Sequence, residues 1–246
     1  MIYLFGDSWG FSYRQAGVQT VADDSDIQVF HGADLSSLMM QELDQRVVNL
    51  CDRGLSLHAI AERLTKSASM FKPGDIVFVL QTDPLRSKFI PWWNGPKDSI
   101  PEIMISKQSN MIDVCDILLR SFYTRLKTIE RVFKVKVVLH GGIGGINHQL
   151  ADEMGITHTM LSSSQVIIPD LPESYFFDAD YVMSNHEVLQ SKYDNYMGEV
   201  SELVEITKYK NHAWSCNPEF FTFNHTTEAG TRLVAKYLAD FKRNLK

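Results

Sequence analysis

The sequence places a serine and a histidine in settings that suit nucleophilic catalysis. Ser8 lies in Gly6-Asp7-Ser8-Trp9, where Gly6 allows a tight turn directly after an apolar run. A serine hydroxyl is a weak nucleophile until a base removes its proton. His225, just ahead of the last amphipathic segment, is the candidate base. Ser8 would then attack a substrate carbonyl, and His225 would act first as base and then as acid.

Acyl transfer also needs hydrogen-bond donors for the negative charge that develops on the carbonyl oxygen. The backbone amides of Ser8 and Gly54 and the hydroxyl of Thr82 are the candidate donors. Asp7 is expected to hold the turn through local hydrogen bonds rather than to react. The polar residues expected to support the site are Asp7, Asn49 and Asp83.

The segments that must position these residues follow the pattern of an α/β protein. Short apolar runs alternate with segments of helical period, which predicts a parallel sheet with helices on both faces. The expected strands are Ile2–Phe5, Val47–Leu50, Ile76–Leu80, Val135–Leu139 and, as a short fifth strand, Val166–Ile168. The predicted fold class is α/β, a three-layer α/β/α sandwich of the flavodoxin-like kind, with about five parallel strands and Ile2–Phe5 near the centre of the sheet.

Four amphipathic segments are expected to form the covering helices. They start after Asp34, at Leu57, at Ile112 and after Thr226 or Thr227. No repeat or linker divides the sequence. We therefore expect a single domain over residues 1–246, with irregular insertions near 84–110 and 141–184.

A polar segment follows directly after each of the first four predicted strands. Ligands of open parallel sheets bind outside the carboxyl ends of the strands. Ser8 follows the first run, Gly54 the second, Thr82 the third and His140 the fourth. One edge of the sheet is therefore the expected site.

These segments resemble the sequence blocks of the SGNH or GDSL hydrolases. Residues 6–14, beginning Gly-Asp-Ser, resemble the first block, and residues 47–54, with an asparagine five residues before a glycine, resemble the second. Residues 80–86 occupy the place of the third block, and residues 222–230, with His225, resemble the last. The resemblance implies the α/β/α fold of that family, with Ser8 as nucleophile and His225 as its base.

Two positions depart from the family pattern. Thr82 stands where the third block has asparagine, and Thr222 stands where the last block has the aspartate that orients the histidine. Loss of such an orienting carboxylate costs about four orders of magnitude in turnover in a well-characterised serine triad. Glu219, Asp180 or a backbone carbonyl remain alternatives for that role.

Two functional hypotheses follow from these observations. The first is a serine-dependent hydrolase of an acyl or acetyl ester, with an acetylated carbohydrate as the favoured substrate. The second, motivated by the departures at Thr82 and Thr222, is a catalytically silent SGNH-like domain that binds a ligand or another protein.

The favoured substrate rests on a tryptophan pair in an irregular segment. Four prolines exclude a regular helix or central strand over residues 84–110: Pro84, Pro91, Pro96 and Pro101. Long irregular connections are often lids. Trp92 and Trp93 would then stack on a sugar or cover an acyl chain, and packing beneath the loop as a satellite core is an equally favoured alternative.

Histidines outside these blocks do not predict a metal site. The spacing of His140, His148, Asp152 and His158 matches no known set of metal ligands, so neither a metal nor another cofactor is expected. Residues 140–145, His140 and the glycine-rich stretch after it, indicate a flexible loop beside the pocket.

Composition excludes several classes of partner. The chain of 246 residues has 24 basic and 30 acidic side chains, a net charge of −6, and no concentrated basic block, so nucleic acid is not expected. No apolar run approaches the roughly 18 residues of a membrane span. Three cysteines without a CxxC spacing predict reduced thiols. Without a recognisable signal peptide, the chain is expected in the cytoplasm.

Overall fold

The computed structural model describes most of the predicted strands and helices. The described residues are 1–7, 10, 34–52, 55–82, 84, 111–142, 144–171, 219, 221–222 and 225–245. For 111–115, 221–222 and 225 only the backbone is described.

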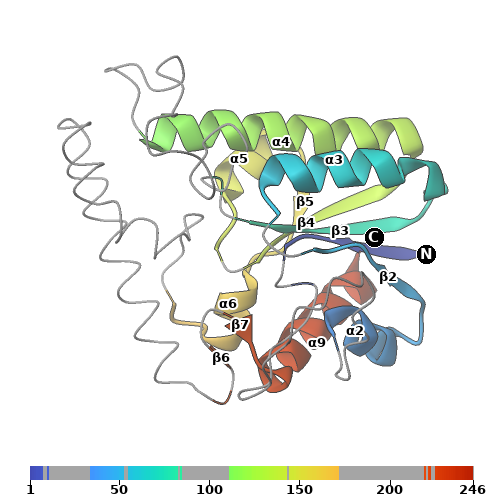
Figure 1. Cartoon of the computed structure of the whole chain (residues 1–246), viewed down its shortest axis with the longest axis vertical. Helices are drawn as coiled ribbons and strands as arrows, with labels where there is room; N and C mark the ends of the chain where they lie inside the picture. The colour runs from blue at the N-terminus through green and yellow to red at the C-terminus, as the bar shows by residue number, and fades with distance from the viewer. Residues whose placement is uncertain are drawn as a thin grey trace, which may run out of the picture.

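A five-stranded parallel sheet forms the middle of the molecule (Figure 1). Its strand order is β2-β1-β3-β4-β5, the order of flavodoxin-like doubly wound sheets. The strands are β1 (Ile2–Phe5), β2 (Val47–Asn49), β3 (Ile76–Gln81), β4 (Lys136–Gly141) and β5 (Thr157–His158). β3 is the central strand, and β1 pairs with it on one side and with β2 on the other.

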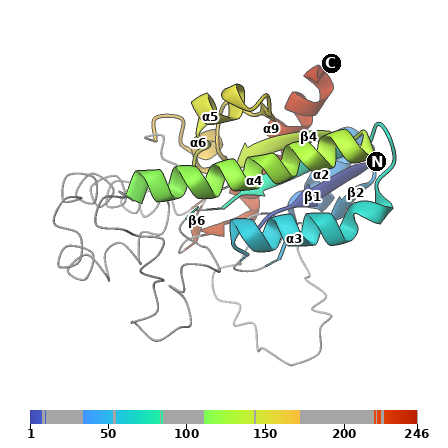
Figure 2. The ribbon, with the colours of Figure 1, turned by 90° about the horizontal axis from the view of Figure 1, so that it is seen from above.

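Helices cover both faces of this sheet, which confirms the three-layer prediction. On one face lie α3 (Leu57–Ser67), α4 (Met111–Phe133) and α5 (His148–Glu153), and Figure 2 shows α3 and α4 running next to each other. On the other face lie α2 (Leu35–Leu43), α6 (Ser163–Ile167) and α9 (Glu228–Asn244).

The apolar runs of the strands supply both cores because successive side chains point to opposite faces. In β1, Tyr3 and Phe5 pack beneath α3 and α4, whereas Ile2 and Leu4 pack against α2 and α9. The residues of β1 and nearly all of those in β3 and β4 are buried, as expected for strands covered on both sides.

The helices begin where the sequence offers capping side chains. Asp34 accepts a hydrogen bond from the backbone N–H of Ser37 at the start of α2. Ser56 caps α3, and Thr227, rather than Thr226, caps α9. After α3 a short 3₁₀ turn, η1 (Ala68–Met70), leads toward β3.

The predicted strand at residues 166–168 is wrong. Residues 163–167 form α6, and the fifth strand is β5 instead. Ser162 and Gln165 form a capping box, in which each side chain accepts a hydrogen bond from the other residue's backbone N–H. This local device favours a helix over the β propensity of Val166, Ile167 and Ile168, and α6 packs in the core shared with α9.

A two-stranded antiparallel pair stands ahead of α9. Its strands are β6 (Phe221–Thr222) and β7 (His225–Thr226), and Thr222 lies directly opposite His225 in the pairing. None of the helices in the described ranges has an apolar stretch long enough to cross a lipid bilayer.

Candidate active site at the carboxyl edge of the sheet

The carboxyl ends of β1, β3 and β4 meet closely enough that side chains are excluded at two positions. A Cβ on Gly6 would lie 2.5 Å from the Cβ of Leu80, and a Cβ on Gly142 would lie 2.9 Å from the carbonyl oxygen of Gln81. The backbone N–H of Gly142 donates to that carbonyl at 3.0 Å. These glycines bring the strand ends into direct contact.

Asp7 and Thr82 join the ends of β1 and β3. The hydroxyl of Thr82 donates to Oδ2 of Asp7 at 2.9 Å, and both residues are only 1% exposed. A buried carboxylate without donors would be costly, so this bond holds both residues in place. The end of β3 is thereby attached to Asp7, the residue that precedes Ser8.

Asn49 makes the equivalent connection on the other side of Ser8. Its Nδ2 donates to the carbonyl oxygen of Gly10 at 2.8 Å, and its Oδ1 accepts from the backbone N–H of Cys51 at 3.0 Å. The backbone N–H of Gly10 in turn donates to the carbonyl of Asp7 at 3.2 Å. The end of β2 is thereby attached to Gly10, two residues after Ser8.

Several residues expected at the site are not among those described. Ser8, Gly54, Asp83, Trp92 and Trp93 lie outside the described residues, and so does Asp180. For Thr222 and His225 only the backbone is described, in β6 and β7. Glu219 is exposed, and its carbonyl oxygen accepts a hydrogen bond from the hydroxyl of Thr227. Their roles stay predictions.

His140 is a fully buried imidazole in β4. The prediction of a flexible loop over residues 140–145 is therefore wrong for His140 and Gly141, which belong to this strand. Nδ1 lies 2.7 Å from Oγ1 of Thr159, and Nε2 lies 2.9 Å from Oγ of Ser163. The hydroxyl of Thr159 donates its proton to the carbonyl of Leu161, so it accepts from Nδ1–H of His140. Nε2 therefore accepts from Ser163.

This environment removes His140 from acid–base chemistry near neutral pH. Burial lowers its pKa to about 3. The neutral imidazole ties β4 to the segment before α6 and to α6 itself. His225 accordingly remains the candidate base.

Gln81 forms a second buried polar link that the sequence did not reveal. Its Oε1 accepts from the hydroxyl of Tyr123 at 2.7 Å, and its Nε2 donates to the carbonyl of Gly145 at 3.1 Å. The available signals were a glutamine ending an apolar strand and a tyrosine within the apolar stripe of α4. Neither signal names its partner, because 42 positions separate Tyr123 from Gln81.

Two other chemistries find no support at the described residues. Within those ranges, no group of three or more His, Cys, Asp or Glu side chains is placed to hold a metal ion. Burial, and after it the charge of Asp7, raises the pKa of the Cys51 thiol well above its usual range. Cys51 therefore stays protonated and unsuited to nucleophilic attack.

Two solved structures are similar to the chain over nearly its whole length. One is a protein described as an SGNH hydrolase from Slackia heliotrinireducens, with 14% identity, a TM-score of 0.40, and coverage of 97% of this chain and 96% of that one. The other is a protein described as a GDSL-like lipase from Parabacteroides merdae, with 13% identity, a TM-score of 0.44, and coverage of 100% and 95%.

No protein-family model and no curated protein matches the sequence.

The contact between Thr82 and Asp7 gives a first prediction. Thr82→Val replaces the hydroxyl by a methyl group of similar size and removes one donor from a buried carboxylate. We expect it to lower the free energy of unfolding by about 1–3 kcal/mol in urea titrations. Thr82→Ser keeps the hydroxyl and serves as the matched control. Equal stability of the two variants would show that this bond does not hold the strand ends together.

His140 gives a second prediction, about pH. Its pKa is about 3 in the folded chain and about 6.5 in the unfolded chain. Between these values the unfolded state binds more protons, so stability falls as the pH is lowered, by up to about 1.4 kcal/mol per unit for this group. In urea titrations between about pH 6 and pH 4, the free energy of unfolding of His140→Gln should therefore change less steeply with pH than that of the wild type.

The control for this titration is Ser163→Ala. It removes one partner of His140 but keeps the imidazole, so it should retain the slope whatever its absolute stability. A His140→Gln slope equal to that of the wild type would contradict the burial argument.

Proposed function

We propose that the chain is a serine-dependent ester hydrolase of the SGNH type. The observation that carries the proposal is the way in which the residues flanking Ser8 are held. Thr82 of the third block bonds to Asp7, and Asn49 of the second block bonds to Gly10. Separate segments of the chain thus converge around the position of the candidate nucleophile, at the edge where parallel sheets bind their ligands.

The proposed reaction proceeds through an acyl-enzyme. Ser8 Oγ bonds to the ester carbonyl carbon while His225 takes its proton, and the alcohol then leaves with that proton. Water, deprotonated by His225, next attacks the acyl carbon and releases the acid and free Ser8. The amides of Ser8 and Gly54 and the hydroxyl of Thr82 are the proposed oxyanion donors.

Thr82 has a second task in this scheme. In the structure its single hydroxyl proton is directed at Asp7. To serve an oxyanion, the hydroxyl must turn away from Asp7 when the substrate is bound. Thr82 would then donate to the oxyanion in the transition state and to Asp7 in the resting enzyme.

The proposed substrate is an acyl or acetyl ester. We favour an acetylated carbohydrate because Trp92 and Trp93 would offer a stacking surface for a sugar ring. Asp83 and Asp7 would serve as supporting residues in this site.

A second candidate function is a catalytically silent SGNH-like binding module. It is favoured by the bond that engages Thr82 and by the presence of threonine, not aspartate, opposite His225 in the β6–β7 pair. A silent module would keep the fold and the strand-end contacts but lack turnover.

Replacement of Ser8 separates the two functions. The wild type should hydrolyse short-chain nitrophenyl esters and react with a fluorophosphonate probe at Ser8, and Ser8→Ala should lose both properties. Ser67→Ala, at the end of α3, is the matched control and should keep both. Absence of label and of Ser8-dependent turnover in a folded wild type would favour the binding module.

Thr222→Asp tests the missing orienting carboxylate. Directly opposed residues of an antiparallel pair have Cβ atoms about 5 Å apart, so an aspartate at 222 comes within reach of His225. We expect turnover to rise at least about tenfold, out of the roughly 10⁴-fold that such a group contributes in a serine triad.

The neutral variant Thr222→Asn, of similar size, should leave turnover unchanged. If Thr222→Asp is no faster than the wild type, another group already orients His225. Glu219→Gln then tests whether that group is the exposed carboxylate of Glu219, three residues before Thr222. Thermal unfolding of each variant shows that a change in rate is not a change in folding.

A further inference from the structure

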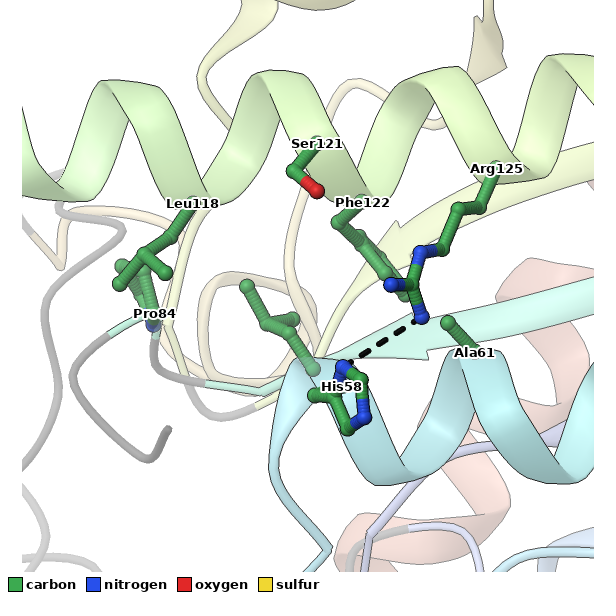
Figure 3. Close-up of a pocket in the computed structure, with 8 residues that line it drawn as sticks. His58, Ala61, Pro84, Leu118, Ser121, Phe122 and Arg125 are labelled. Carbon is green, nitrogen blue, oxygen red and sulfur yellow. Dashed lines mark hydrogen bonds between the residues drawn. The ribbon is translucent and has the colours of Figure 1, made fainter. Parts of the chain in front are cut away.

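A pocket lies between α3 and α4 (Figure 3). It encloses about 380 Å³ of space, which includes space open to solvent. Leu57, Ala61, Pro84, Leu118 and Phe122 give it an apolar lining, and its polar groups are His58, Ser121 and Arg125.

Arg125 is the unusual member of this set. Its guanidinium donates to Nδ1 of His58 at 3.3 Å, across the two helices, and among the described residues no carboxylate is paired with it. Two of the other three arginines on these helices are paired with carboxylates. Arg63 contacts Asp52 at 2.6 Å, and Arg120 contacts Glu153 at 3.3 Å.

The contact with His58 leaves Arg125 with most of its hydrogen-bonding capacity. Guanidinium is always protonated and carries five N–H donors, so Nδ1 of His58 must be an acceptor and its ring is neutral. One donor is used in this contact. Within the described part of the chain the others have no hydrogen-bond partner and can bind a carboxylate, which guanidinium holds through two parallel hydrogen bonds.

The pocket thus combines a cationic end with an apolar end. In Figure 3, Arg125 and Ala61 lie toward one side, whereas Leu118 and Pro84 lie toward the other. Phe122 is nearly fully buried between them, with 3% exposure. An inorganic anion would leave the apolar lining uncovered, and an uncharged hydrocarbon would give the guanidinium no counter-charge.

We propose that this pocket binds a small amphipathic monocarboxylate, with its carboxylate on Arg125 and its hydrocarbon chain along Leu118 and Phe122. Ser121 adds a hydroxyl donor beside the same space. The site adjoins the candidate active site, because Pro84 follows Thr82 by two residues at the end of β3. Its ligand class matches the acid that ester hydrolysis releases, but its binding does not depend on the proposed hydrolysis.

Calorimetric titration of the full chain with hexanoate tests the site. Hexanoate should bind with one-to-one stoichiometry, and acetate and hexan-1-ol, which lack the chain and the charge respectively, should bind at least about tenfold more weakly. Arg125→Gln should weaken hexanoate binding at least about tenfold. Arg131→Gln, an exposed arginine on the same helix outside the pocket, should leave it unchanged.

The apolar end has its own variant. Leu118→Gln should weaken binding of hexanoate but not the weaker binding of acetate. Ser8→Ala should bind hexanoate like the wild type, so failure of the esterase proposal and failure of this one are separate results. No hexanoate binding at millimolar concentration, or equal affinity in Arg125→Gln with thermal unfolding unchanged, would overturn the proposal.

Discussion

The parallel pairing of β1 with β3 is the constraint on which the rest of the site depends. Phe5 lies opposite Val79, so the two chains leave the sheet side by side with Asp7 and Thr82 within hydrogen-bond distance. This register is enforced by burial, because a shift by one residue would turn each apolar side chain to the other face. The position of the residues before Ser8 is therefore determined by two hydrophobic cores that take no part in chemistry.

Burial at this edge of the sheet also explains why two of its polar side chains are not free to react. Gln81 and His140 are both buried, and each of their side chains is bonded at two atoms. An unpaired polar group there would cost about 1–3 kcal/mol, so strand ends that meet in the interior need such partners to be stable. A polar residue after a buried strand can therefore be needed to pair other buried polar groups, without any part in chemistry. His140, neutral and fully bonded, illustrates why a histidine at the expected edge need not be a base.

Sequence patterns predicted the strands and helix starts that local residues determine. They did not predict the hydrogen bonds between residues far apart in the chain. Continuous apolar runs identified β1, β3 and β4, and side-chain oxygens at Asp34 and at Thr226 or Thr227 indicated helix starts, because both signals act within a few residues. Three consecutive β-branched residues at 166–168 suggested a strand, but the capping box at Ser162 favoured a helix. The bonds of Gln81 to Tyr123 and of Arg125 to His58 join residues 42 and 67 positions apart, and no local pattern encodes them.

Position 82 holds threonine where the resembled sequence block has asparagine, and the two side chains differ in the number of hydrogen bonds that they can donate simultaneously. An asparagine amide has two N–H donors, so it can hold a neighbouring carboxylate and still offer a donor to an oxyanion. A threonine hydroxyl has one proton, and in this chain that proton is directed at Asp7. In the proposed reaction, the remaining contacts of Asp7 would have to stabilise its carboxylate while Thr82 turns toward the substrate. In the proposed site, the hydrogen bonding of Asp7 would thus decide whether the hydroxyl of Thr82 can serve as a donor to the substrate.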